Sequence, residues 1–344
     1  MDYFDILKKN VVKRDDQGYA LYFRFNNKEI EKVNGLRDIN LKNKKIDFDT
    51  HFRLASVSKQ FIACGIVKLV SEGLLSFDTC VLDIFDCLPD YFKNIKVINL
   101  LNHTSGIYDY EDWGHEEDAP QVLDYQIIDF LKTTDKTYFE VGSKYQYSNT
   151  AYVLLGLIIE KISKKTLGEY IENNVFKPAG MLSSYVNYQG ITNIPDRAYG
   201  HIVDKDGNLY MKDQYWCSAT IGDGGLYSSI NDLKKWVDFY KSEKSAYLWP
   251  NIFSKQRRCD NLKEGEHNKY NEIYYYGMGM RTIVLENGKE IYYHCGETIG
   301  TNTLLLFSKD YDLVCLFLSN FSEVSGSTLK DNVLELIHTV LNNK

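Results

Sequence analysis

The sequence has no apolar run of the length that a membrane-spanning helix requires. Its longest apolar runs cover residues 152–159 and 313–318, whereas a transmembrane helix needs about 20 consecutive apolar residues. Residues 1–10 also lack the apolar core and the small-residue cleavage site of a secretory signal. A chain trimmed at its start would look the same, but we expect a cytoplasmic protein with no membrane partner.

Long basic runs are missing as well. The 344 residues include 40 Lys and Arg against 47 Asp and Glu, which gives a formal net charge of −7. This mild acidity argues against nucleic acid as the main partner. Because 44% of the residues are hydrophobic, the chain can form one large domain or two interlocked subdomains.

Neither the cysteines nor the histidines show the spacing of a metal site. The seven cysteines are scattered without a Cys-x-x-Cys pair, and the seven histidines show no His-x-x-x-His spacing. We therefore predict no metal, no other cofactor and no disulfide framework, and free, mostly buried thiols fit a reducing compartment. The glycine-rich segment 222–225 reads as a flexible turn, and no Lys-Ser or Lys-Thr follows it to form a phosphate-binding loop.

Among the residues that are present, Ser56 and Lys59 form a Ser-x-x-Lys spacing at the start of a helix-like run. Positions i and i+3 of a helix share one face, so the hydroxyl and the amine would point into the same space. A serine nucleophile needs an adjacent base, and a lysine can be that base when burial or a second cation lowers its pKa. Free N–H groups at the helix N-terminus suit a developing oxyanion. The spacing alone also fits an N-cap serine beside a surface lysine.

Hydrophobic periodicity predicts the elements that surround this segment. We expect helices at 58–72, 151–162, 232–240 and 331–341, and strands at 19–25, 29–33, 273–280, 281–285, 290–294, 303–307 and 313–318. The helix at 58–72 is apolar on more than one face, so it should be central, and Gly73 is its expected C-cap. Asn287-Gly288 predicts a hairpin turn.

Two polar groups precede the helix at 151–162. Tyr147 and Asn149 lie two residues apart in a loop, where both could face one pocket, although Asn149 or Thr150 could simply cap the helix. His103 lies in a tight polar turn, where a turn-stabilising role is preferred to a catalytic one. The acidic segment 111–118 is expected to be a solvated loop or the rim of a cleft.

A third group, His294-Cys295-Gly296, lies on a late strand. Because successive strand residues face opposite sides, His294 and Gly296 share one face and Cys295 lies on the other. If His294 faces the active site, Cys295 does not, and a cysteine nucleophile is not expected there. Gly296 would let a substrate backbone lie close to the strand.

The order Ser-x-x-Lys, Tyr-x-Asn, His-x-Gly resembles that of the serine β-lactamase and penicillin-binding protein superfamily, whose motifs include Ser-x-x-Lys, Ser-Asp-Asn and Lys-Thr-Gly. Here Tyr147-x-Asn149 stands in the second place and His294-x-Gly296 in the third. The chain looks most like the class C β-lactamase and D-aminopeptidase/esterase branch, and lesser similarities extend over roughly residues 15–340.

The resemblance implies an α/β (α+β) fold of the β-lactamase/transpeptidase type. An antiparallel sheet would be flanked by helices, with a mostly helical region inserted into the sheet subdomain. Residues 1–55 and 270–344 would form the sheet subdomain and residues 56–269 the helical one, with the active-site cleft between them.

Catalytic roles follow from the same resemblance. Ser56 would be the nucleophile, Lys59 its base or proton shuttle, and Tyr147 would pass the proton to the leaving group. Lysine and tyrosine both have ordinary pKa values near ~10. Side by side, each makes the other a better proton carrier, because the ammonium stabilises the phenolate.

Substrate-binding roles are implied for four further residues. Asn149 would hold a substrate amide, and His294 and Gly296 would line the strand beside the substrate. The N–H groups of Ser56 and Glu297 would form the oxyanion hole.

The third motif departs from true β-lactamases, where lysine is common at the position of His294 and helps to bind the substrate carboxylate. Histidine is frequent in the esterase- and peptidase-like branch. We therefore expect a serine hydrolase that forms an acyl-enzyme on a small ester, amide or D-amino-acid peptide. A β-lactamase or D,D-carboxypeptidase proper and a non-catalytic binding protein that kept the fold are the alternatives. The expected partner is a small-molecule or peptide substrate, and the sequence does not fix the oligomeric state.

Overall fold

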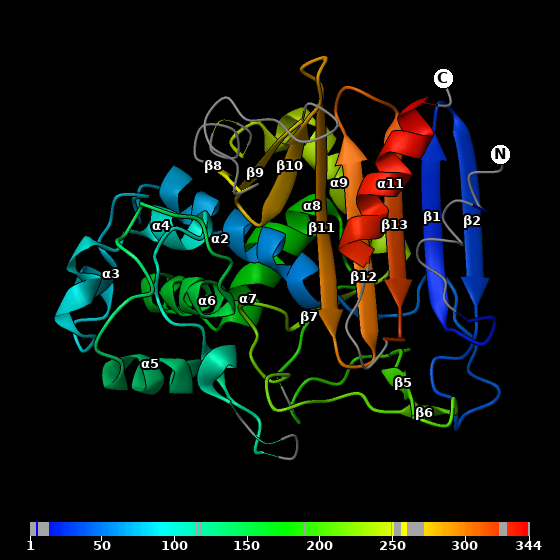
Figure 1. Cartoon of the computed structure of the whole chain (residues 1–344), viewed down its shortest axis with the longest axis horizontal. Helices are drawn as coiled ribbons and strands as arrows, with labels where there is room; N and C mark the ends of the chain where they lie inside the picture. Colours follow the sequence, from blue (N-terminus) through cyan, green and yellow to red (C-terminus); the bar gives the residue numbers. More distant parts are fainter. Residues whose placement is uncertain are drawn as a thin grey trace.

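Figure 1 shows the computed structural model of the chain, in which a large sheet stands beside a mostly helical region. The structure describes residue 5, residues 14–322 except positions 115, 117–118, 189, 249, 251–255 and 260–271, and residues 329–342. The mixed fold expected from the sequence, an antiparallel sheet flanked by helices, is confirmed.

Within the described residues, the main sheet has eight strands in the order β2-β1-β13-β12-β11-β10-β9-β8, with every pairing antiparallel. The strands are β1 (Tyr19–Phe25), β2 (Lys28–Asn34), β8 (Arg257–Arg258), β9 (Ile273–Gly277), β10 (Met280–Val284), β11 (Glu290–Thr298), β12 (Thr301–Ser308) and β13 (Leu313–Ser319). An early strand thus pairs with a late one, β1 with β13 (Figure 1). The edge strand β8 comes from the range expected to be helical.

Two smaller sheets lie outside the main one. Their strands are β3 (Phe52–Arg53), β7 (Leu226–Ser228) and β4 (Tyr185–Val186) in one, and β5 (His201–Val203) and β6 (Leu209–Met211) in the other. β3 pairs with β7, which directly follows the glycine-rich segment 222–225. This segment lies beside the turn of Ser56, because a Cβ on Gly224 would be 3.5 Å from Ala55 Cα.

The helical elements come mainly from the middle of the chain. The α-helices are α2 (Lys59–Ser71), α3 (Val81–Ile84), α4 (Val97–Leu101), α5 (Asp124–Thr133), α6 (Asn149–Ser163), α7 (Leu167–Ile171), α8 (Lys177–Ala179), α9 (Ile230–Lys241) and α11 (Leu329–Asn342). Short 3₁₀ turns are η1 (Ala55–Ser58), η2 (Asp90–Asn94), η3 (Tyr110–Trp113) and η5 (Glu243–Ser245), and η4 (Glu172–Phe176) is a π-helical turn. No helix in the described part of the chain has the length and apolar character needed to cross a membrane. The cytoplasmic location stays a prediction.

The sheet separates two hydrophobic cores, because successive strand residues face opposite sides. On β12, Leu305 and Phe307 belong to the core shared with the helical region, whereas Leu304 and Leu306 belong to the core beneath α11. Burial of both faces explains why β12 and β13 are continuous apolar runs rather than alternating ones. The catalytic candidates lie on the side of the helical region.

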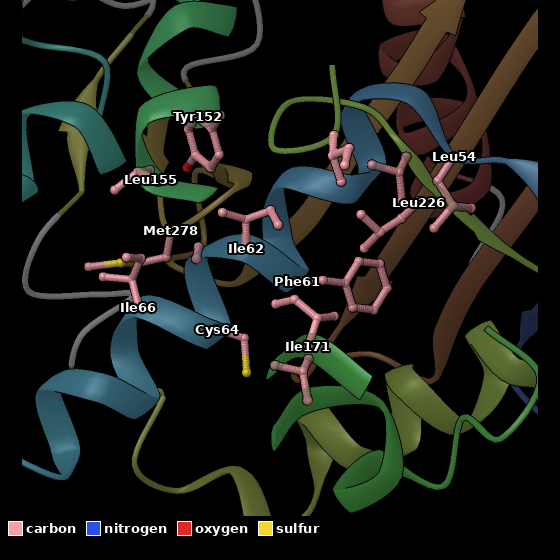
Figure 2. Packing of buried hydrophobic residues seen from close by; sticks show 14 of the residues in the cluster. Leu54, Phe61, Ile62, Cys64, Ile66, Tyr152, Leu155, Ile171, Leu226 and Met278 are labelled. Atoms are coloured by element: carbon pink, nitrogen blue, oxygen red, sulfur yellow. The ribbon is translucent and has the colours of Figure 1, made fainter. Parts of the chain in front are cut away.

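Helix α2 is buried on several sides, as its sequence predicted. Phe61, Ile62 and Ile66 are fully buried, and Figure 2 shows Phe61 directed toward Leu226 while Ile66 lies near Met278. The helix ends one residue earlier than expected, and Gly73 follows with a φ of 72°, a left-handed conformation that glycine adopts at little cost.

The hairpin between β9 and β10 corrects one predicted boundary. We expected a strand over residues 273–280, but β9 ends at Gly277 and Met280 begins β10. Met278 and Gly279 form the turn with φ values of 54° and 75°, as in a type I′ turn. A Cβ on Gly279 would lie 2.4 Å from the backbone nitrogen of Gln60. The glycine therefore lets the hairpin tip reach the first turn of α2.

Candidate active site

Ser56 lies in the η1 turn immediately before α2, rather than in the regular helix itself. The preceding residue, Ala55, has a φ of 46°. Residues other than glycine rarely adopt this left-handed conformation, and such strain is concentrated at functional sites. The strained turn fixes the direction of the Ser56 side chain at the surface of a cleft.

Lys59 is the first residue of α2, and its amine contacts three acceptors. Lys59 Nζ lies 2.9 Å from Ser56 Oγ, 2.6 Å from Asn149 Oδ1 and 2.7 Å from the Asp223 carbonyl oxygen. The lysine is fully buried. Burial lowers the pKa of Lys59 to about 8, against the opposing effect of carboxylates that include Asp223 and Glu111.

The three acceptors fix the direction of the lone pair when Lys59 is uncharged. A neutral amine has two hydrogens and one lone pair, and the amide and carbonyl oxygens of Asn149 and Asp223 can only accept. These two oxygens take the two hydrogens, so the lone pair is directed at the Ser56 hydroxyl. The arrangement suits an amine that removes a proton from serine.

Tyr147 packs beside this pair. Lys59 Nζ lies 5.0 Å from the centroid of the Tyr147 ring, and the phenolic oxygen is buried without a hydrogen-bond partner among the described residues. Burial raises the pKa of Tyr147 well above its ordinary value of 10, and the adjacent Ser56 hydroxyl partly offsets this rise. The two hydroxyl groups are neighbours that do not form a hydrogen bond in this structure. Tyr147 therefore offers a neutral O–H group beside the serine.

Asn149 begins α6, but it is not the helix cap. Ser148 is the N-cap, and its side chain accepts a hydrogen bond of 3.2 Å from the Ala151 N–H. The interpretation of Asn149 or Thr150 as the cap is therefore wrong. Because Ser148 satisfies the helix end, the Asn149 side chain is left to contact Lys59.

Both ring nitrogens of His294 are bound within the protein. His294 Nδ1 lies 2.6 Å from the Cys295 carbonyl oxygen, and Nε2 lies 3.0 Å from the Tyr276 hydroxyl. A carbonyl only accepts, so Nδ1 carries the proton and Nε2 accepts from the tyrosine. Burial, together with the positive charges of Arg281 and Lys59, holds the pKa of His294 well below 6.5. His294 is thus a neutral wall of the cleft.

Strand alternation on β11 follows the prediction. Tyr292 packs in the core shared with the helical region, whereas Tyr293 and Cys295 pack with the core beneath α11. Residue Cys295 also borders the cleft, but its packing neighbours are those of the opposite face. The thiol is free.

Gly296 lies against the turn that holds Ser56. A Cβ at this position would lie 2.2 Å from the Leu54 carbonyl oxygen, 2.3 Å from Thr303 Oγ1 and 3.1 Å from the Ser56 nitrogen. The close neighbour of the glycine is therefore the protein's own backbone, whereas the sequence led us to expect a substrate backbone. The glycine lets β11 pack directly on η1.

These elements enclose an open cleft of about 350 Å³. The sequence-predicted residues that line it are Ser56, Tyr147, Asn149, His294 and Glu297, and the other lining residues are Arg53, Ala55, Glu111, Cys217, Asp223, Gly224, Arg281, Cys295 and Thr298. Lys59 and Gly296 lie behind this lining. The lining comes from both of the ranges that we predicted as subdomains, and that division stays a prediction.

Arg281 and Glu111 bring opposite charges to the cleft lining. Arg281 was not singled out from the sequence, whereas Glu111 begins the segment 111–118 that we expected to be a solvated loop or the rim of a cleft. The guanidinium carbon of Arg281 lies 5.8 Å from the ring centroid of Tyr147 and 5.5 Å from that of Tyr276, and no carboxylate among the described residues forms an ion pair with it. Glu111 supplies the opposite charge. Glu111 is exposed, but the protein around its carboxyl group removes water from it. This desolvation, together with the negative charge of Asp109, raises the pKa of Glu111 to about 7.

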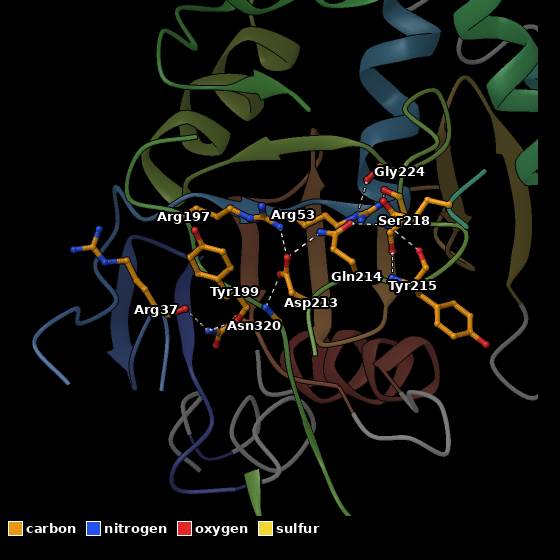
Figure 3. Close-up of polar contacts among 12 residues, drawn as sticks. Arg37, Arg53, Arg197, Tyr199, Asp213, Gln214, Tyr215, Ser218, Gly224 and Asn320 are labelled. Atoms are coloured by element: carbon orange, nitrogen blue, oxygen red, sulfur yellow. Dashed lines mark hydrogen bonds and ion pairs between the residues drawn. The ribbon is translucent and has the colours of Figure 1, made fainter. Parts of the chain in front are cut away.

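Arg53 anchors the loop that carries the Asp223 carbonyl. Arg53 Nη2 donates to the Ser218 carbonyl at 2.8 Å, and Nε donates to the Gly224 carbonyl at 3.3 Å. Figure 3 shows the end of the Arg53 side chain directed toward Gly224 and Ser218. Arg53 lies on β3, just before Ser56, so these hydrogen bonds fix the glycine-rich segment 222–225, which we expected to be a flexible turn.

Asp124 holds the same loop from the helical side. Its carboxylate accepts hydrogen bonds from the Ile221 N–H at 2.8 Å and the Gly222 N–H at 3.1 Å. Burial raises the pKa of Asp124 to about 7. The Asp223 carbonyl between these anchors is thus a fixed acceptor for Lys59. Within the described ranges, no cluster of three or more His, Cys, Asp or Glu side chains is placed to hold a metal ion.

The comparison with known families decides the assignment. The model of the Beta-lactamase family matches residues 7–338, nearly the whole chain. The chain belongs to the Beta-lactamase family. The resemblance inferred from the three motifs is confirmed, and the expected class, a β-lactamase-related serine hydrolase, agrees with this membership.

Individual members of the family show how far the similarity extends. Penicillin-binding protein 4* of Bacillus subtilis (strain 168) is 30% identical over 291 residues, which cover 79% of this chain and 61% of that protein. The chain spans about three fifths of the length of the curated relatives it matches.

Two solved structures have the same fold as this member of the Beta-lactamase family. The octameric penicillin-binding protein homologue from Pyrococcus abyssi has a TM-score of 0.77 at 25% identity, covering 93% of this chain and 74% of that chain. The D-amino acid amidase from Ochrobactrum anthropi SV3, solved with D-phenylalanine, has a TM-score of 0.77 at 22% identity. The match covers 100% of this chain and 100% of that chain. At that identity the second similarity shows the fold alone.

Proposed function

We propose that the protein is a serine hydrolase that forms an acyl-enzyme at Ser56 on a small ester, amide or D-amino-acid peptide. The observation that carries this proposal is the 2.9 Å contact between Lys59 Nζ and Ser56 Oγ, made by an amine whose pKa burial lowers to about 8. Near neutral pH a fraction of this lysine is uncharged and can accept the serine proton.

In the acylation step, Ser56 Oγ attacks the substrate carbonyl carbon while its proton passes to Lys59. The amine keeps its hydrogen bonds to Asn149 and Asp223 throughout, so it changes charge without moving. The Ser56 and Glu297 N–H groups would stabilise the oxyanion. Close packing of β11 on η1 supports this pairing, because it brings the two backbone segments together.

Tyr147 completes the step as the donor to the leaving group. When the tetrahedral intermediate collapses, the bond from the carbonyl carbon to the leaving atom breaks, and that atom takes the Tyr147 proton. Lys59 then returns a proton to the phenolate. In deacylation the oxygen of a water molecule forms a bond to the acyl carbon, and the water gives one proton to the same carriers. The bond between Ser56 Oγ and the acyl carbon then breaks, and the carriers return the proton to Ser56 Oγ.

Asn149 is proposed to bind the acyl portion of the substrate. Its Oδ1 is used by Lys59, so its Nδ2 hydrogens are what it offers to a substrate amide carbonyl. His294 is proposed to shape the wall opposite, and Glu297 to contribute its N–H. Gly296 is proposed to act behind this wall, where it lets β11 pack on the turn of Ser56.

The charge of Arg281 favours a second candidate, a β-lactamase or D,D-carboxypeptidase acting on substrates that carry a carboxylate. Arginine stays charged at every working pH and binds carboxylates through its planar fork. Neutral His294 does not supply this charge. Arg281 lies beside Tyr147, so a substrate carboxylate there would lie on the leaving-group side of the scissile bond.

A labelling experiment separates the enzyme from a non-catalytic binding protein. A fluorophosphonate and a fluorescent penicillin should each label the wild-type protein, and Ser56→Ala should not be labelled. A panel of p-nitrophenyl esters, D-alanyl p-nitroanilide and nitrocefin then separates the two candidate activities. A folded wild-type protein that neither probe labels would favour the binding protein.

A further inference from the structure

His103 contacts the loop of Tyr147 on both sides of the tyrosine. The Gln146 N–H donates to the His103 carbonyl at 2.9 Å, and the Ser148 N–H donates to His103 Nδ1 at 3.1 Å. Between these two hydrogen bonds, the centroid of the Tyr147 ring lies 4.4 Å from that of the histidine. One residue thus contacts three successive residues of the loop.

His103 is itself rigidly held. It follows α4 in a turn with a φ of 58°, and it is fully buried. The rings of Tyr276 and Tyr152 lie 4.4 Å and 5.2 Å from the imidazole centroid. His103 is not among the residues that line the cleft, so it does not contact a substrate there.

The hydrogen bonds also fix the chemical form of His103. Since Nδ1 accepts from a backbone N–H, the ring proton is on Nε2, which has no hydrogen-bond partner among the described residues. Burial, with the positive charges of Lys59 and Arg281, lowers the pKa of His103 well below 6.5. The imidazole therefore stays neutral and does not act as an acid or base at working pH.

Tyr147 depends on such support because its own hydroxyl has no hydrogen-bond partner among the described residues. The direction of the phenol is consequently set by the backbone on either side and by the rings packed against it. His103 supplies both of these constraints, whereas Tyr276 and His294 supply only ring contacts, at 5.9 Å and 6.1 Å.

We propose that His103 is a positioning residue that holds the Tyr147 hydroxyl where the leaving group takes its proton. The inference rests on the proposed function, in which Tyr147 is the proton donor. The effect of removing His103 should therefore depend on the leaving group of the substrate. Loss of His103 should impair reactions that need a protonated leaving atom and spare those that do not.

The test compares the p-nitroanilide and the p-nitrophenyl ester of the same D-alanine acyl group. The anilide nitrogen must be protonated as it leaves, whereas nitrophenolate leaves unaided. In His103→Ala, kcat/KM for the anilide should fall by about 10²-fold, the cost of a misplaced group, and kcat/KM for the ester by less than roughly threefold. His201→Ala, which removes a buried histidine outside the cleft lining, should affect both substrates alike.

Rescue and double mutation exclude a general structural effect. His103→Asn should keep anilide activity within about tenfold of wild type, because asparagine tolerates the left-handed turn and its side-chain oxygen can accept the Ser148 N–H. In a Tyr147→Phe background, His103→Ala should cause no further loss with the anilide, because the two residues act as a unit.

Equal losses for both substrates in His103→Ala, or a further loss in the Tyr147→Phe background, would overturn the inference. If His103→Ala does not fold, His103→Phe keeps a ring and removes the acceptor, and it should show the same selective loss relative to His103→Asn. Fluorophosphonate labelling of the wild-type protein distinguishes a failure of the proposed function from a failure of the role proposed for His103. A protein that is not labelled contradicts the proposed function, whereas a labelled protein with an unchanged anilide-to-ester ratio contradicts only the role of His103.

Discussion

Arg281 lies against the ring of Tyr147, with its guanidinium carbon 5.8 Å from the ring centroid. This contact places a permanent positive charge beside the proton donor of the proposed mechanism. The third-motif residue, His294, has both ring nitrogens bound within the protein. Substrate charge should therefore be sensed by a residue from β10 rather than by the motif on β11.

The first prediction concerns a matched acid and methyl ester that differ only in a leaving-side carboxylate. Wild type should prefer the acid by roughly 1–2 kcal/mol, typical of a charge-assisted contact, and Arg281→Met should lose this preference. In a Glu111→Gln background, which removes the cleft carboxyl group whose pKa is raised to about 7, the preference should stay constant in kcat/KM from pH 5.5 to 9. Arginine stays charged over this range, and the pKa of His294 lies well below 6.5. Arg257 is exposed and does not line the cleft, so the control variant Arg257→Met should keep the preference for the acid. In the Glu111→Gln background, a preference that grows as the pH falls toward 6 would assign the carboxylate to a histidine instead.

The second prediction is that covalent modification occurs at Ser56. Ser56→Ala should remove labelling and lower turnover by on the order of 10⁶, with thermal stability close to wild type because the half-buried hydroxyl packs little. Ser58 is buried and accepts from the Leu226 N–H, and Ser148 caps α6. Mass spectrometry that located the adduct on either of these serines would contradict the assignment.

The third prediction concerns the proton carriers. Lys59→Ala and Tyr147→Phe should each lower turnover by roughly 10²–10⁴, and their effects should not add, because the groups act as a unit. Retention of full amide activity in Tyr147→Phe would exclude the shuttle role.

The pH profile identifies the base. Burial lowers the pKa of Lys59 to about 8, so the ammonium form dominates below pH 8 and the active amine above it. For wild type, kcat/KM should rise with pH and level off above about 8. Glu111, whose pKa is raised to about 7, is the competing explanation for such a rise, and Glu111→Gln should leave the upper part of the profile in place. A profile that becomes flat in Glu111→Gln would assign the base to the carboxylate.

The fourth prediction is that thiol reagents are not mechanism-based inhibitors. Cys295 packs with the core on the far side of β11, so Cys295→Ser should keep most activity toward esters and most fluorophosphonate labelling. Loss of labelling in a folded Cys295→Ser protein would show that the thiol takes part in the chemistry.

The local part of the site could be predicted because it depends on short spacings. Ser56 and Lys59 are three residues apart on one helical turn, and the alternation of His294 and Cys295 follows from the strand period of two. The central position of α2 followed from its apolar faces. These features are encoded within a few successive residues.

Other features depend on residues that are distant in the sequence. Arg281 and Glu111 meet in one cleft only because β10 and η3 are folded against it. The turn at Met278 escaped prediction because methionine rarely adopts a positive φ. Gly296 carries a packing role against Leu54 that no local pattern reveals. Which close approach requires a glycine is decided by tertiary packing.

The pairing of β1 with β13 has a consequence for the synthesis of the protein. Tyr19 pairs with Ser319, so the inner edge of β1 finds its partner only after 300 more residues have been made. At ordinary ribosome speeds this takes roughly 15–60 s. During that time the apolar strand β1 exposes one unpaired edge, whereas the charged outer strand β2 pairs with its other edge. The yield of native protein should therefore depend on chaperone capacity and on translation pauses during that interval.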